Sequence, residues 1–239
     1  MMRSLMTLTA VTAIAATGRA ADTGFLDKKF KDANGKEIPY VVFVPHDYKK
    51  GTPCPTILFL HGAGETKGGA KQPVAVGIGP AIKKREKTFP FITIIPQAQK
   101  RSWHADGDNG KMAMAMLAAI EKEYNVDPKR TYLSGLSMGG YGTWSLAAAF
   151  PDKWAAIAPV CGGGTPADAE KIKDIPCWNF HGDKDTAVPV AKSREMIAAL
   201  KKAGGKPKYT EYPGVGHNSW DDAYGTDELY KWLLEQSKK

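Results

Sequence analysis

The sequence predicts an α/β fold built on an open, mostly parallel sheet, with helices on both faces, an antiparallel hairpin at the N-terminal edge and no large lid. The first observation behind this prediction is that apolar runs, typical of strands buried on both faces, alternate with helical patterns. The second is that turns rich in glycine, histidine and acidic residues follow several of these runs. Such turns collect at one edge of a parallel sheet, where ligands usually bind.

The expected strands begin with the hairpin. Residues 30–32 and 38–44 are strand-like, and Asn34-Gly35 between them is typical of a tight turn. The remaining expected strands are the apolar runs at 56–60, 91–95, 131–133, 155–160, 178–180 and 208–212.

Helical patterns fill the intervals. They cover residues 110–124, 138–150, 190–202 and 226–236. Asp108 or Asn109 is the expected N-cap of the first helix, and Thr226 that of the last. Pro151 ends the second helix.

The chain of 239 residues carries a formal net charge of +8. Its lysines and arginines are scattered, which indicates a solvated surface and no nucleic-acid partner. No repeat or linker interrupts residues 21–239, so we expect one domain there.

Residues 1–20 have the pattern of a signal peptide. Arg3 precedes an apolar run over residues 4–16, and Gly18-Arg19-Ala20 offers small residues for cleavage. The run is short for a membrane span. We therefore expect a secreted or periplasmic protein without stable membrane insertion after cleavage; a retained anchor or a core helix is the alternative.

The three cysteines are Cys54, Cys161 and Cys177. Their spacing is unlike a metal site, and neither a metal nor another cofactor is expected. Buried free thiols are the favoured interpretation. If two of them pair, Cys161 and Cys177 are the candidates, because they lie at the ends of neighbouring expected strands.

The chemistry centres on Gly135-Leu136-Ser137-Met138-Gly139, a Gly-x-Ser-x-Gly pattern between an expected strand and a helix. A serine at such a turn needs a base and an acidic partner. Asp183 and Asp185 follow one later strand, and His217 follows the last. Backbone donors for an oxyanion are available at Met138 and in the loop 61–65.

Four segments in this order resemble the α/β-hydrolase superfamily, and within it secreted esterases related to phospholipase/carboxylesterases and poly(3-hydroxybutyrate) depolymerase-like proteins. They are residues 60–65, 135–140, 181–189 and 216–220. The resemblance implies that Ser137 is the nucleophile and His217 the base. It places the acid at the fifth position of His-Gly-x-x-Asp, which favours Asp185 over Asp183. It makes the N–H groups of Ala63 and Met138 the oxyanion hole.

Further residues are candidates for substrate binding, with an alternative role for each. Gly64 and Glu65 adjoin the oxyanion loop, where Glu65 could equally brace the loop. Trp103 and Trp220 are candidate pocket walls or core residues. His61 and His181 each precede a glycine at a strand end, and we expect them to hold loop backbone.

The sequence therefore predicts a serine carboxylic-ester hydrolase that works through an acyl-enzyme on short-chain or polymer-attached esters, so its expected partner is a small-molecule or polymer ester. Residues 162–176 leave room for one short helix where lids of this superfamily often enter, which indicates an open site. A serine peptidase of the prolyl-oligopeptidase-like type and a non-catalytic binding protein are the alternatives. The natural ester, the acyl-length preference and the oligomeric state do not follow from the sequence.

Overall fold

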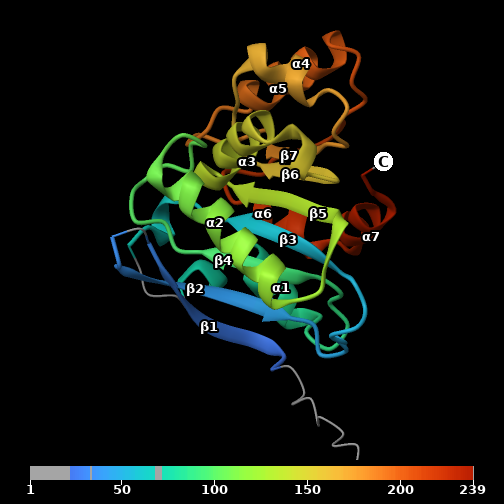
Figure 1. Cartoon of the computed structure of the whole chain (residues 1–239). Coiled ribbons are helices and arrows are strands. Elements are labelled where there is room, and N and C mark those ends of the chain that lie inside the picture. Colours follow the sequence, from blue (N-terminus) through green and yellow to red (C-terminus); the bar gives the residue numbers. More distant parts are fainter. Residues whose placement is uncertain (1–21, 33, 68–71, 239) are drawn as a thin grey trace, which may run out of the picture.

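The computed structural model describes residues 22–32, 34–67 and 72–238 (Figure 1). The expected signal peptide at residues 1–20 lies outside the described residues.

The central element is an eight-stranded sheet in the order β1-β2-β4-β3-β5-β6-β7-β8. β1 pairs antiparallel with β2, and β2 pairs antiparallel with β4, while every other neighbouring pair is parallel. The expected N-terminal hairpin and mostly parallel sheet are therefore confirmed. The strands are β1 (Gly24–Lys31), β2 (Glu37–Val44), β3 (Cys54–Leu60), β4 (Ile92–Pro96), β5 (Val126–Leu136), β6 (Ala156–Val160), β7 (Trp178–Gly182) and β8 (Lys208–Tyr212).

Helices cover both faces of the sheet (Figure 1). Buried side chains of α2, α3, α4 and α5 form the core on one face, and those of α1, α6 and α7 form the core on the other. The helices are α1 (Ile78–Lys84), α2 (Asp108–Glu123), α3 (Met138–Ala149), α4 (Ala169–Ile172), α5 (Ala191–Lys202), α6 (Trp220–Gly225) and α7 (Asp227–Glu235).

The uninterrupted apolar runs of the sequence follow from this layering. In β3, Leu58 and Leu60 pack into one core while Ile57 and Phe59 pack into the other, and all four are fully buried. Because successive side chains of a strand point to opposite faces, a strand covered on both sides needs apolar residues at every position.

The helix termini agree with the sequence in one case and differ in another. Thr226 caps α7, since its hydroxyl accepts the Glu228 N–H at 3.3 Å. The expectation that Asp108 or Asn109 caps α2 is wrong, because Gly107 occupies that position. The side chain of Asn109 is buried and instead accepts the Gln99 N–H at 2.9 Å, which braces the preceding loop.

The segment between β6 and β7 is short. Gly162 to Pro176 contains one 3-10 turn, Pro166–Asp168, and the single-turn helix α4. This segment forms no large lid, as expected.

All three cysteines are buried and free, as favoured from the sequence. Within residues 22–32, 34–67 and 72–238, no helix has the length and apolar character needed to cross a membrane.

Candidate active site

The candidate residues meet at the carboxyl edge of the parallel strands. Ser137 directly follows β5, Asp185 follows β7, and His217 follows β8. The loop with Ala63 follows β3. Strands that run in one direction end at one edge, so residues up to 154 positions apart, from Ala63 to His217, gather there.

Ser137 occupies a strained turn between β5 and α3. Its backbone has φ 54° and ψ −117°, which is unusual for a residue with a side chain. The Ser137 N–H donates to the Val160 carbonyl at 2.9 Å, which ties the turn to β6. Strain of this kind is typical of functional turns and presents the hydroxyl beyond the end of the strand.

Gly139 allows α3 to start against β3. A Cβ at this position would overlap the Leu60 carbonyl oxygen and approach the carbonyl carbon at 2.5 Å. Both obstacles are backbone atoms and cannot rotate away. A glycine is therefore required here for the turn to close.

Replacing Gly139 with alanine is expected to destabilise the protein by about 3 kcal/mol or more, because strand and helix must separate to admit the methyl group. Urea unfolding followed by circular dichroism measures this. The matched control is Gly225→Ala, since a Cβ at Gly225 meets nothing within 4 Å. Equal stability of the two variants would contradict the close packing of α3 on β3.

Ser137, His217 and Asp185 form a hydrogen-bonded chain. The Ser137 Oγ lies 2.9 Å from His217 Nε2, and His217 Nδ1 lies 2.7 Å from Asp185 Oδ2. A carboxylate only accepts, so the proton of the ring belongs on Nδ1. Nε2 is then the acceptor for the serine hydroxyl. This is the arrangement in which a hydroxyl can pass its proton to an imidazole.

Asp185 is held in place from two directions. Its exposed fraction is 8%, and its Oδ1 accepts the N–H groups of Ala187 at 2.9 Å and Val188 at 2.8 Å. Burial by itself would raise the pKa of Asp185, but the hydrogen bonds from His217 and these two amides outweigh it and hold the pKa below its usual value. The group is an anion at neutral pH.

Asp183 does not join this chain. Its Oδ1 accepts the Gly214 N–H at 2.7 Å and so connects the loop after β7 to the loop after β8. The geometry at the carboxyl edge therefore favours Asp185, as the resemblance implied.

Two backbone N–H groups beside Ser137 are available to bind an anion. Met138 begins α3 and Ala63 begins a 3-10 turn, Ala63–Glu65. Among the described residues, neither N–H has an acceptor. The N-terminus of α3 adds a partial positive charge at Met138.

His61 fixes the loop that carries Ala63. The Ala98 N–H donates to Nε2 at 2.9 Å, so the ring proton lies on Nδ1, which donates to the Gly62 carbonyl at 2.6 Å. Burial lowers the pKa of His61 to about 4, and the ring is neutral at pH 7. The expected role of His61 in holding loop backbone is confirmed.

A cavity of about 450 Å³ adjoins the backbone N–H groups of Ala63 and Met138. Trp103 forms one wall, although it is almost fully buried and donates from Nε1 to the His61 carbonyl at 2.9 Å. Tyr141 is 41% exposed and faces the same space. The remaining lining residues are Ala63, Arg101, Ser102, His104, Met138, Gly142 and Ser145.

The other candidate binding residues lie around the same edge. Gly64 is exposed in the 3-10 turn, and half-buried Glu65 has Oε2 3.9 Å from His61 Nδ1. Trp220 begins α6, and its ring meets the His217 ring edge-on with centroids 5.3 Å apart. The candidate binding residues were Gly64, Glu65, Trp103 and Trp220, and of these Trp103 alone lines the cavity.

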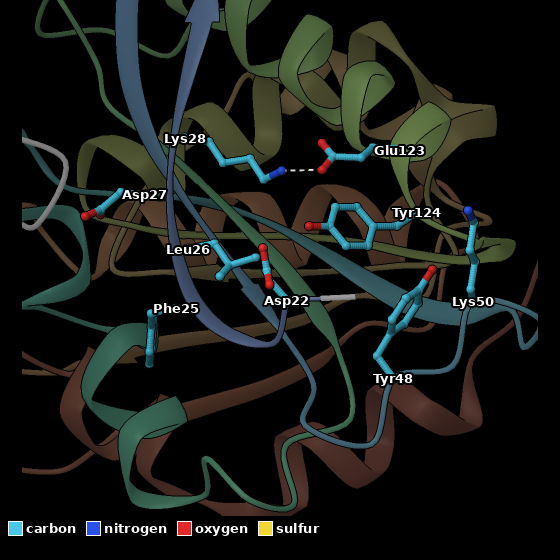
Figure 2. A pocket seen from close by; sticks show the side chains of 9 residues that line it. All are labelled: Asp22, Phe25, Leu26, Asp27, Lys28, Tyr48, Lys50, Glu123 and Tyr124. Atoms are coloured by element: carbon cyan, nitrogen blue, oxygen red, sulfur yellow. Dashed lines mark hydrogen bonds and ion pairs between the residues drawn. The ribbon is translucent and has the colours of Figure 1, made fainter. Parts of the chain in front are cut away.

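A second hollow lies away from this edge, between β1 and the end of α2 (Figure 2). Lys28 pairs with Glu123 across it and lies 5.3 Å above the Tyr124 ring. Tyr48 packs edge-on against Tyr124 at 5.6 Å. These contacts join the N-terminal strand to α2, and neither Ala63 nor Met138 lines this hollow.

One group of possible metal ligands occurs in the described part of the chain. The ligand atoms of Cys161, Asp185 and His217 lie within 4.8 Å of one another. However, Asp185 and His217 bind each other, and burial raises the pKa of the Cys161 thiol to about 12. Because the ligand atoms of Asp185 and His217 already engage each other, we assign these two residues to the hydrogen-bonded chain from Ser137 and not to a metal centre.

Sequence reasoning missed one contact at this site. His181, expected only to hold loop backbone, also reaches Asp185, with Nε2 3.1 Å from Oδ2. The spacing of four residues between His181 and Asp185 was the available signal. It indicates a contact only if the loop after β7 folds back. The Asp185 N–H donates to the Gly182 carbonyl and closes that loop.

The sheet order, the strained serine turn and the hydrogen-bonded side chains at the carboxyl edge define an α/β-hydrolase. The chain belongs to the Dienelactone hydrolase family, whose model matches residues 36–225. The predicted superfamily is thereby confirmed.

Three similar proteins support this assignment. A solved structure of a thermostable esterase superposes with a TM-score of 0.83 at 37% identity, over 90% of this chain and 63% of that one. A probable feruloyl esterase C of Aspergillus niger is 25% identical over 84% of this chain and 74% of its own length. A poly(3-hydroxyalkanoate) depolymerase C of Paucimonas lemoignei is 25% identical over 67% of this chain and 40% of its own length. The chain thus spans less than two thirds of the depolymerase and of the thermostable esterase.

Proposed function

We propose that this protein is a serine carboxylic-ester hydrolase with Ser137 as nucleophile, His217 as base and Asp185 as its partner. The observation that carries the proposal is the continuous chain of hydrogen bonds from Ser137 Oγ through His217 to Asp185, at 2.9 and 2.7 Å. It stands beside a cavity and the N–H groups of Ala63 and Met138, which have no acceptor in the described part of the chain; acyl transfer needs these parts.

The reaction proceeds in two halves. Ser137 Oγ attacks the ester carbonyl carbon while His217 Nε2 takes the hydroxyl proton. The carbonyl oxygen becomes an oxyanion facing the N–H groups of Ala63 and Met138. The intermediate collapses, the ester C–O bond breaks, and the leaving alcohol receives the proton from His217. Water then attacks the acyl-serine, again giving its proton to His217, and the acid leaves as Ser137 is restored.

The cavity supports compact ester substrates. Its volume of about 450 Å³ lies within the usual range for small-molecule sites, and aromatic and aliphatic side chains form much of its wall. The short segment between β6 and β7 leaves the site open on that side. The names of two relatives, a feruloyl esterase and a depolymerase, extend the proposal from short-chain esters to esters carried on polymers.

The proposal includes an exported location. The signal-like residues 1–20 support cleavage and export of a catalytic domain over residues 21–239.

A fluorophosphonate probe separates this proposal from a non-catalytic role. The native protein is expected to gain one covalent adduct on Ser137, found by peptide mass spectrometry, because the probe needs an activated hydroxyl. Heat-denatured protein is the control and should remain unlabelled. An unlabelled native protein, or an adduct on another serine, would contradict the assignment. A panel of esters and peptides on the same preparation then distinguishes an esterase from a peptidase.

A further inference from the structure

His181 is a buried histidine beside the proposed acid. It lies in β7 with an exposed fraction of 0%, four residues before Asp185. Its Nε2 is 3.1 Å from Asp185 Oδ2 and 2.9 Å from the Val188 carbonyl oxygen. Its Nδ1 is 2.7 Å from the Ser193 hydroxyl, which is also fully buried.

These partners determine which nitrogen carries a proton. A carboxylate and a carbonyl oxygen both only accept, so Nε2 of His181 must be an N–H donor. Nδ1 contacts the Ser193 hydroxyl, which also lies 3.3 Å from the Gly162 carbonyl oxygen. The ring therefore directs its Nε2–H at Asp185 and is held on its other side by Ser193 of α5.

We propose that His181 is a positioning residue that holds the Asp185 carboxylate in register with His217. The proposal rests on the function proposed above. Oδ2 accepts two ring N–H groups, from His217 at 2.7 Å and from His181 at 3.1 Å. Oδ1 accepts two backbone N–H groups, from Ala187 and Val188. With both oxygens engaged, the carboxylate cannot rotate without breaking several bonds at once.

A purely structural role would not require this geometry. The Val188 carbonyl alone would satisfy the Nε2 proton of a core histidine. Here the same proton is shared with the oxygen that supports His217. That oxygen carries charge, which strengthens the hydrogen bond and makes its orientation matter when His217 becomes a cation.

Two amide variants that differ by one methylene group test the proposal. The glutamine amide nitrogen can reach the position of the ring Nε2, whereas the asparagine amide reaches only as far as Nδ1. His181→Gln should keep kcat for p-nitrophenyl acetate within about threefold. His181→Asn should lose about tenfold to a hundredfold in kcat, the range for a hydrogen bond to a charged group, with KM unchanged. Unchanged kcat in His181→Asn, or equal losses in both variants, would overturn the proposal.

Nitrogen NMR of the histidine rings in the wild-type protein gives a test that does not depend on variant folding. A proton on His181 Nε2 is expected, and a ring without one overturns the proposal. The fluorophosphonate result keeps the two proposals distinct. If Ser137 labels normally while His181→Asn keeps full kcat, the positioning role falls and the esterase stands. If Ser137 does not label, the esterase proposal itself falls.

Discussion

Replacing Ser137 with alanine is expected to lower kcat for p-nitrophenyl butyrate on the order of a millionfold. His217 Nε2 would then have no hydroxyl at 2.9 Å to activate, and the turn between β5 and α3 would present only a methyl group. Binding and the two N–H donors would leave some residual rate above that of water. Initial rates over a range of enzyme concentrations measure the loss.

The fold of this variant should persist. The Ser137 Oγ makes its hydrogen bond to His217, while the turn itself is held by backbone bonds, including Ser137 N–H to Val160. The far-ultraviolet spectrum and unfolding midpoint should therefore match the wild type. Wild-type turnover in the folded variant would refute Ser137 as the nucleophile.

The second large effect is expected for Asp185→Asn, with kcat about ten-thousandfold lower. The amide oxygen would stay with the Ala187 and Val188 N–H groups, because both can only donate, whereas His181 can keep its Nε2 proton on the Val188 carbonyl and His217 can move its proton to its other nitrogen. The amide NH₂ group would then face His217 Nδ1 and force the ring proton onto Nε2. In that state Nε2 cannot accept the Ser137 proton, and the imidazolium formed in the reaction loses its counter-charge.

Asp183→Asn is the matched control for this prediction. An asparagine carbonyl can still accept the Gly214 N–H that Asp183 Oδ1 accepts at 2.7 Å. Its kcat should stay within a few-fold of the wild type in the same steady-state assay. If Asp183→Asn lost the activity and Asp185→Asn kept it, the acid would have to be reassigned.

The sequence predicted the elements whose residues are dictated by burial. The fully apolar runs at 56–60, 91–95 and 155–160 became the buried strands β3, β4 and β6. It did not predict α1, a seven-residue helix that follows Gly77 at φ 66°. It also underestimated β5, whose first half, Val126 to Arg130, is polar and pairs with β3 only through Val126 and Cys54 before a bulge. In α1, Ile78, Ala81 and Ile82 have helical spacing, but the pattern covers little more than one turn and includes Pro80, while the first half of β5 has no apolar period.

The candidate site was predictable as far as chain order determines it. Each proposed catalytic group follows its own strand, so a parallel sheet brings Ser137, Asp185 and His217 together. The hydrogen bond between His181 and Asp185 depends instead on how one loop turns after β7. The cavity depends on side chains from α3 and from the loop around Trp103, whose relative position no sequence spacing reveals.

The position of β8 at the edge of the sheet links activity to local unfolding. Among the described residues, β8 has its one sheet partner in β7, and none of its five residues is fully buried. Local opening costs least where buried contacts are few, so this edge can detach at a lower free energy than the core around β3 and β5. The position of His217 depends on β8, the strand that precedes it in the chain. We therefore expect activity to be lost on heating before most of the molecule unfolds, because the attachment of this edge strand positions His217.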